Sequence, residues 1–312
     1  MSSIEKLYLP SFNEMNNEEK VQLLASILPK DYKVEYTNDH IQVIYNEKVF
    51  IFVPGCKGVT LGWSSEDKVP DDLLNQEKEF IEMIRKEMDE TGYEGEKPEF
   101  SAQKFIEEFN GHMSPIRTVD IGPMLVEPII HPTSIEVAKV DRQTNEIISQ
   151  KEGFDPFDFY KPNPNFPQYD GLETQVFSQK GNILYRCIDG IIYFYTFYSP
   201  NTLKANLKPP YRLMTEDEWE YFYTGTKREF EPEVPDYIYI AKNPYEYEIV
   251  ESPCGAKGGD GGCCVCGCEG PAKLRLVLCP FFRNCDECRP EANDKASSYN
   301  NYRLMIRVEE II

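Results

Sequence analysis

The sequence predicts an α+β fold with short strands, a few helices and long ordered loops. Hydrophobic residues make up 41% of the 312 residues and aromatic residues 13%, which is typical of a globular protein rather than a disordered one. Proline (23), tyrosine (20) and phenylalanine (18) are plentiful, which favours ordered loops between short elements. Both helical and strand-like periodicities occur along the chain.

The first 63 residues are predicted to form one helix and four short strands. The segment "NNEEKVQLLASILP" carries an apolar helical stripe, and Pro29 ends that helix. The stripe consists of Val21, Leu23, Leu24, Ile27 and Leu28. The segment "YKVEYTNDHIQVIYNEKVFIFVPG" predicts three strands with turns at "TND" and "NEK", and "VTLGW" predicts a fourth strand.

Two helices are predicted next. The segment "PDDLLNQEKEFIEMIRKEMDE" has apolar residues at helical spacing and begins with acidic residues, as a helix N-terminus favours. The segment "SAQKFIEEFNG" predicts a shorter helix that is capped by Ser101 and stopped at Gly111.

The middle and the end of the chain are predicted to be rich in strands. From "RTVDIGPMLVEPIIHPTSIEVAKVD" onwards the pattern is that of β-structure. The proline-rich and aromatic segment "EGFDPFDFYKPNPNFPQYDG" predicts an ordered surface loop whose rings pack inward. An Asp-Gly turn in "NILYRCIDGIIYFYTFY" predicts a hairpin, and "YNNYRLMIRVEEII" predicts a closing strand.

A capped helix is predicted within "PPYRLMTEDEWEYFYTGTK". Thr215 and Glu218 have the spacing of a capping box, in which each side chain bonds the backbone N–H of the other residue. Glu216 also suits the positive end of the helix dipole, Trp219 is predicted to face the core, and Gly225 supplies the stop. The acids are therefore interpreted as capping groups rather than catalytic ones.

This segment resembles the formylglycine-generating enzyme family, the sulfatase-modifying factors, whose corresponding segment runs approximately Arg-Leu-Pro-Thr-Glu-x-Glu-Trp-Glu-Tyr. The chain has "RLMTEDEWEY", with Met214 in place of the usual proline. The segments "VFIFVPGCKGVTLGW" and "NNYRLMIRV" resemble the family's opening strand pair and closing strand, and "SPIRTVDIGPMLVEP" is a weaker match. The resemblance runs in the family's order from about residue 48 to residue 310.

The resemblance implies a C-type-lectin-like domain with little regular structure, long loops, and N- and C-terminal strands that lie close together. On this basis residues 1–46 form an N-terminal helix and strands packed on the core, and residues 47–312 form the family domain, with a cysteine-rich metal-binding insert at about 254–288.

The family's chemistry carries over only in part. Its aerobic enzymes hold copper with two cysteines of a C-terminal loop and oxidise a cysteine of a substrate peptide; here the nearest equivalents are Cys279 and Cys285. Five residues separate them instead of the family's four, and the Gly-Gly-Ser strand and the Asn-Val-Trp-Glu-Trp motif are absent from the sequence. His40, His112 and His131 are not closely spaced, so the iron site of the related sulfoxide synthases is not predicted either.

The cysteine spacing predicts a structural zinc site. Cys263-x2-Cys266 is followed after eighteen residues by Cys285-x2-Cys288, and two such turns can offer four thiolates to one tetrahedral ion. A four-thiolate site leaves no position for water, so such a zinc ion is structural. Disulfides, free thiols, a second metal or a different ligand set remain open, because further cysteines lie nearby. These are Cys254, Cys264, Cys268 and Cys279. Cys56 and Cys187 are predicted to be buried small hydrophobes.

The composition of the chain makes some classes of binding partner unfavourable. The net charge of −20 disfavours nucleic acid and anionic membranes as partners, and no signal peptide or membrane span is predicted, so we expect a cytoplasmic protein. The function predicted from the sequence is non-catalytic binding of a protein, peptide or small ligand through the loop face. The alternatives are a copper-dependent oxidase that converts a peptide cysteine to formylglycine, and a zinc-knuckle interaction module fused to an unrelated domain.

Overall fold

The computed structural model shows a mixed α+β fold, as predicted, in two compact units. It describes residues 2–37, 39–159, 161, 174–177, 183–240, 244, 246–251, 255–259, 270–283 and 300–312. The first unit comprises Met1–His131, Leu207–Ala292 and Asn301–Ile312, and the second comprises Pro132–Asn206 and Asn293–Asn300. Residues 1–46 therefore belong to the same unit as most of the chain that follows them.

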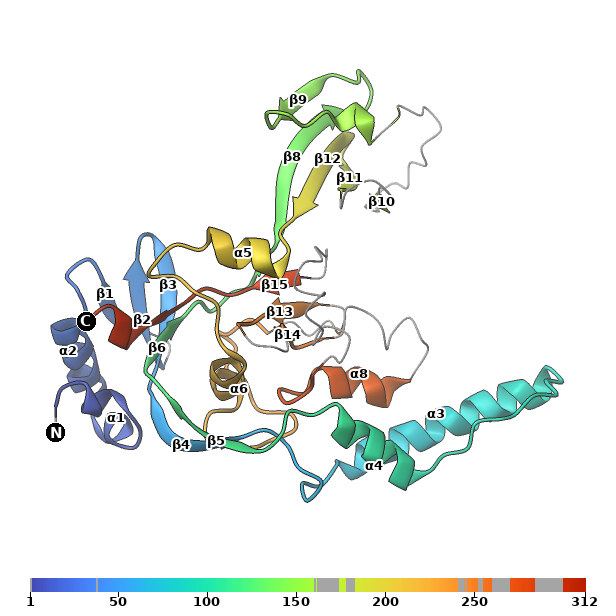
Figure 1. Cartoon of the computed structure of the whole chain (residues 1–312), viewed down its shortest axis with the longest axis horizontal. Helices are drawn as coiled ribbons and strands as arrows, with labels where there is room; N and C mark the ends of the chain where they lie inside the picture. Colours follow the sequence, from blue (N-terminus) through green and yellow to red (C-terminus); the bar gives the residue numbers. More distant parts are fainter. Residues whose placement is uncertain are drawn as a thin grey trace. The chain divides into compact units, whose positions relative to one another are not determined.

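The first unit contains most of the helices (Figure 1). Its helical elements are η1 (Glu5–Leu7), α1 (Ser11–Glu14), α2 (Asn17–Ile27), α3 (Asp71–Glu90), α4 (Ala102–Gly111), α6 (Glu216–Thr224), α8 (Pro271–Val277) and η4 (Val308–Glu310). Its strands are β1 (Lys33–Thr37), β2 (His40–Tyr45), β3 (Lys48–Val53), β4 (Cys56–Leu61), β5 (Arg117–Ile121), β6 (Met124–Val126), β13 (Tyr247–Ile249), β14 (Ala256–Lys257) and β16 (Met305–Arg307). The sequence predicted α2, α3, α4 and α6 correctly.

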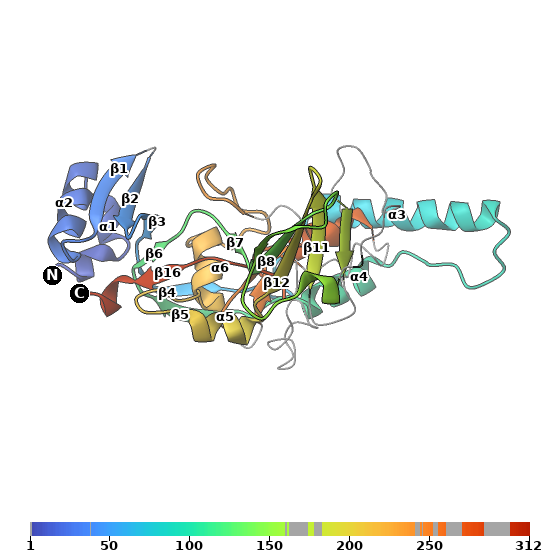
Figure 2. The same ribbon diagram turned by 90° about the horizontal axis from the view of Figure 1, so that it is seen from above.

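One antiparallel sheet joins the beginning of the chain to its end. Its strand order is β1-β2-β3-β6-β16, so β6 lies between the third strand and the closing strand. Asn46 and Glu47, both with positive φ, make the β2–β3 turn predicted at "NEK". The first and last elements consequently lie side by side (Figures 1 and 2), and the Tyr8 hydroxyl donates a hydrogen bond to Glu309.

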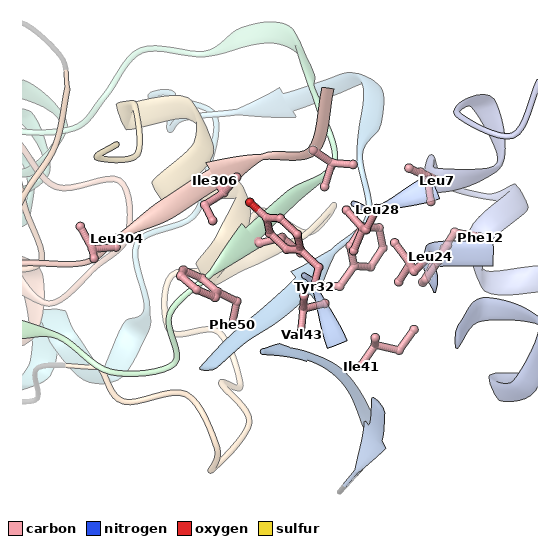
Figure 3. Close-up of a cluster of buried hydrophobic side chains, with 13 residues drawn as sticks. Leu7, Phe12, Leu24, Leu28, Tyr32, Ile41, Val43, Phe50, Leu304 and Ile306 are labelled. Atoms are coloured by element: carbon pink, nitrogen blue, oxygen red, sulfur yellow. The ribbon is translucent and has the colours of Figure 1, made fainter. Parts of the chain in front are cut away.

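A hydrophobic cluster packs α2 against one face of this sheet. Leu24 of α2, Phe50 of β3 and Ile306 of β16 are all fully buried in it. Figure 3 shows these side chains together with Leu28 and Tyr32. The helical stripe predicted from the sequence therefore faces the core, and the N-terminal residues are part of the same hydrophobic core as the closing strand.

A second cluster holds α3, α4 and α8 around Trp63. The buried side chains of Leu73, Phe109 and Val277 come from these three helices. Ser101 caps α4 by accepting a hydrogen bond from the backbone N–H of Lys104 at 3.3 Å, as predicted.

Two smaller sheets complete the first unit. Strands β4 and β5 pair with each other. The other sheet has the order β14-β13-β15-β7, in which β7 is His131–Pro132 and β15 is Asn300–Tyr302.

The second unit is built on a separate antiparallel sheet. Its elements are β8 (Ser134–Asp141), β9 (Ile147–Gln150), η2 (Pro156–Asp158), β10 (Thr174–Phe177), β11 (Leu184–Ile188), β12 (Ile191–Phe197) and α5 (Pro200–Asn206), with strand order β10-β11-β12-β8-β9. The predicted hairpin turn at Asp189 and Gly190 is present, and both residues have positive φ. The rings of Phe154 and Phe157 pack on the sheet, as predicted for the aromatic loop, most of which lies outside the described residues. Within the described ranges of both units, no helix is long and apolar enough to cross a membrane.

Candidate functional site

Helix α6 begins with the capping box that the sequence predicts. The Thr215 hydroxyl accepts a hydrogen bond from the Glu218 backbone N–H at 3.2 Å, and the Glu218 carboxylate accepts one from the Thr215 N–H at 2.7 Å. Trp219 faces the core with 3% exposure, also as predicted. Glu218 has a further role, because Arg307 of β16 donates to its other oxygen at 2.7 Å. The cap therefore also fastens the helix to the closing strand.

The acidic residues of α6 form a compact ion-pair group that the sequence analysis interpreted only as capping. Lys257 of β14, whose side chain is fully buried, contacts Glu220 at 2.9 Å and Glu216 at 3.4 Å. The guanidinium group of Arg283 donates one hydrogen bond to each carboxylate oxygen of Glu216, at 2.7 and 2.5 Å. Arg117 of β5 lies 3.0 Å from Glu220. We call these five residues the α6 ion cluster.

The electrostatics of the α6 ion cluster favour the ionised form of Glu216. Burial opposes ionisation, but the hydrogen bonds from Arg283 and the charges of Lys257 and Arg117 outweigh it and lower the pKa of Glu216 to about 2. Glu216 is therefore ionised at neutral pH, and three cations stabilise its charge.

The cysteines of the predicted zinc site lie outside the described residues. This holds for Cys263, Cys266, Cys285 and Cys288, and for Cys254, Cys264 and Cys268. The described residues that flank them do meet: Lys257 precedes the first cysteine pair, Arg283 precedes the second, and both contact the carboxylate of Glu216. Within the described ranges, no three histidine, cysteine or acidic side chains are placed to hold a metal ion.

Cys279 lies in an apolar environment. It follows α8, is 1% exposed and packs in the cluster around Trp63. Burial raises the pKa of its thiol to about 12, which opposes formation of the thiolate that a copper(I) site or a redox reaction requires. The burial of Cys279 weighs against a copper site there, and its proposed partner Cys285 lies outside the described residues.

The other two described cysteines lie in strands, as expected, but they are half-buried rather than buried. Cys56 is the first residue of β4 and Cys187 belongs to β11. Both pack against a hydrophobic cluster but are only partly buried, so the prediction that they are buried small hydrophobes is confirmed only in part.

If Cys279 is structural, Cys279→Ser should lower the free energy of unfolding by about 1–3 kcal/mol, because it buries a hydroxyl group in an apolar cluster. The matched change Cys56→Ser should cost less, because Cys56 is half-buried. Tryptophan fluorescence during urea unfolding measures both values, since Trp63 and Trp219 are the only two tryptophans and both belong to the first unit. Equal costs for the two variants would contradict the structural role.

An open groove of about 650 Å³ lies beside the C-terminal half of α6. One wall comes from β3 and the opposite wall from residues 225–238. Five of its lining residues are aromatic: Tyr237 is half-buried, and Phe52, Tyr221, Phe222 and Tyr223 lie beneath it with exposures of 3–9%; we call these five the aromatic floor. We call this hollow the α6 groove. The sequence analysis did not predict this groove, and the only related signal in the sequence is its high content of tyrosine and phenylalanine.

A buried arginine contacts the lining of the α6 groove. The side chain of Arg303 is 1% exposed. Its guanidinium group donates a hydrogen bond to each carboxylate oxygen of Glu248, at 2.9 and 3.1 Å, and a third to the Tyr223 hydroxyl at 3.0 Å. It also donates to the backbone carbonyls of Glu127 at 2.7 Å and Tyr239 at 2.6 Å. Tyr223 belongs to α6 and lines the groove, and Tyr239 directly follows the lining segment 225–238, so one side chain ties α6 to the end of that segment.

A second hollow of about 500 Å³ lies beside the same wall segment. Ile129 and residues 234–240 line it, and it shares Pro235, Tyr237 and Ile238 with the α6 groove. Ile129 and Tyr239 are exposed by 53% and 50%, so this hollow presents apolar surface to solvent.

Comparisons of the chain with protein-family models, with curated proteins and with solved structures find no match.

Proposed function

We propose that the chain is a divergent member of the formylglycine-generating-enzyme-like superfamily, with a C-type-lectin-like fold, and that it binds a peptide or protein segment through the α6 groove without catalysis. The sheet that places β3 and the closing strand β16 on the two sides of β6 supports the family proposal, because the resemblance implies that the N- and C-terminal strands lie close together.

The α6 groove is the observation that carries the binding proposal. It has the size of a ligand site, half-buried apolar side chains such as Leu9, Val53 and Tyr237 line it, and Arg303 ties α6 to Tyr239 at the end of the lining segment before any ligand arrives. A preorganised groove loses little conformational entropy on binding, so more of the contact energy contributes to affinity. The burial and raised pKa of Cys279 weigh against the copper-dependent oxidase.

A large side chain placed in the α6 groove should weaken the binding of peptides. We expect peptides selected on the purified full chain from a random displayed library to bind Thr226→Trp about tenfold or more weakly, because Thr226 lines the groove and is exposed. The matched change Thr118→Trp, on the exposed face of β5, should alter the affinity by less than about twofold. Fluorescence anisotropy gives the dissociation constants. Selected peptides that bind both variants equally well would contradict the α6 groove as the binding site.

We also propose that Cys263, Cys266, Cys285 and Cys288 hold a structural zinc ion. Cys263 lies six residues beyond Lys257 and Cys285 two beyond Arg283, so extended chain reaches at most about 22 Å and about 7 Å from these anchors. Both anchors contact Glu216, and the two cysteine pairs are thus within reach of one common point.

The purified protein should contain about one zinc ion per chain, with four thiols protected until a chelator is added. The double change Cys263→Ser/Cys266→Ser should remove the metal, and the control Cys56→Ser/Cys187→Ser should retain it. Plasma mass spectrometry and thiol titration measure both quantities. Zinc retained in the first variant, or absent from the wild type, would contradict the assignment.

A further inference from the structure

The exposed rim of the α6 groove is acidic. Glu229, Glu231 and Glu233 line it and are all exposed, and among the described lining residues Lys227 is the only cation. Asp236, which lines the neighbouring hollow, adds a further negative charge. The chain as a whole carries a net charge of −20, so no positive background compensates the rim.

The three rim carboxylates differ in how strongly they are already paired. Glu231 accepts two hydrogen bonds from Arg275, at 2.8 and 2.9 Å. Glu229 lies 3.6 Å from Lys227, a long and exposed pair that contributes little. Glu233 makes no ion pair with any described residue. Glu229 and Glu233 are therefore the carboxylates that a ligand can use.

The aromatic floor beneath this rim suits a particular kind of cation. Lysine and arginine side chains place a long aliphatic stem on apolar surface while the charged head stays in water. Tyr237 is half-buried and stacks on His40, with ring centroids 3.9 Å apart, so a stem would lie along the exposed part of Tyr237 and bring its head to the carboxylates at the groove edge. A small inorganic cation would leave the aromatic floor unused.

We propose that the occupant of the α6 groove is a segment of another protein that presents a lysine or arginine beside apolar residues. This inference rests on the proposed binding function. The basic side chain pairs with Glu229 and Glu233, and apolar neighbours bind the adjoining hollow, where Ile129 and Tyr239 are exposed. The two hollows share Pro235, Tyr237 and Ile238, so one peptide can contact both.

The test uses three fluorescein-labelled peptide libraries and the full chain. Each library has about ten residues per peptide with randomised apolar positions, and two fixed positions are Lys and Arg in the first library, Gln in the second and Glu in the third. We expect the Lys-Arg library to bind about tenfold or more tightly than the Gln library, the Glu library to bind weakest, and the difference to shrink between about 50 and about 300 mM salt.

A pair of charge-matched variants locates the effect. Glu229→Lys/Glu233→Lys should weaken binding of the Lys-Arg library by about tenfold or more. Glu94→Lys/Glu96→Lys changes the net charge by the same amount at exposed residues after α3, and should change affinity by less than about twofold. Equal losses in both variants, or full competition by spermidine at the affinity of the peptides, would overturn the inference.

The outcomes separate this inference from the function on which it rests. Peptides that carry no basic residue but lose binding in Thr226→Trp would retain the α6 groove as a binding site and overturn its charge preference. Peptides of any charge that are insensitive to Thr226→Trp would overturn the groove itself.

Discussion

Replacing Arg303 with methionine should lower the free energy of unfolding of the first unit by about 3–5 kcal/mol, the largest effect expected for a single substitution. The change keeps most of the side-chain volume, but it leaves the carboxylate of Glu248, 3% exposed, without its cation. The carbonyls of Glu127 and Tyr239 each lose a donor as well. An uncompensated buried charge costs more than the pair contributes, which sets the size of the effect.

The double variant Arg303→Met/Glu248→Leu should recover a large part of the lost stability, since it removes both charges. Arg275→Met is the matched control. Arg275 pairs with two carboxylates, those of Asp72 and Glu231, but both are exposed. We therefore expect this change to lower the free energy of unfolding by about 1 kcal/mol or less. Urea unfolding followed by tryptophan fluorescence measures all three. If Arg303→Met and Arg275→Met cost the same, Arg303 is not the buried support of the groove.

Glu216→Gln should destabilise the first unit by about 3 kcal/mol at neutral pH, and this difference from the wild type should disappear as the pH falls. The ordinary pKa of a glutamic acid side chain is 4.5, and that of Glu216 in the fold is about 2. A lowered folded-state pKa contributes stability that is fully present above pH 4.5 and is lost as the pH falls through about 2. Glutamine mimics the protonated glutamic acid side chain, so the free energies of unfolding of the wild type and of Glu216→Gln should become equal at acid pH.

The measurement is the difference in unfolding free energy between the wild type and Glu216→Gln at a series of pH values, which cancels the titration of other acids. Glu94→Gln, exposed and outside any described ion pair, should show a difference below about 0.5 kcal/mol throughout. A difference for Glu216→Gln that stays constant from neutral to acid pH would mean that its charge has no part in stability.

Local features of the fold could be predicted from the sequence because their causes lie within a few residues. The capping box at Thr215 and the hairpin turn at Asp189 depend on neighbouring side chains and on backbone dihedral preferences. Burial of the α2 stripe likewise follows from periodicity alone. These predictions needed no knowledge of what the elements pack against.

The candidate site could not be predicted in this way because it depends on partners far apart in the chain. Nothing in the sequence distinguishes Glu220, which binds a fully buried lysine, from the many solvated acids of a chain with charge −20. The same is true of Arg303 and Glu248, which pair with each other beneath Tyr223 of the groove lining. The predicted capping role of Glu216 was incomplete for the same reason, since Lys257 and Arg283 come from distant elements.

The position of β6 between β3 and β16 also has a consequence for synthesis of the protein. A growing chain displays the hairpins of β1–β3 early, and β6 can join them once Met124–Val126 has emerged. The far edge of β6 then stays unpaired until Met305–Arg307 is made, because no earlier described strand occupies that edge. During translation of everything in between, the nascent chain exposes an open strand edge and an incomplete core, the condition in which partly made proteins aggregate or recruit chaperones.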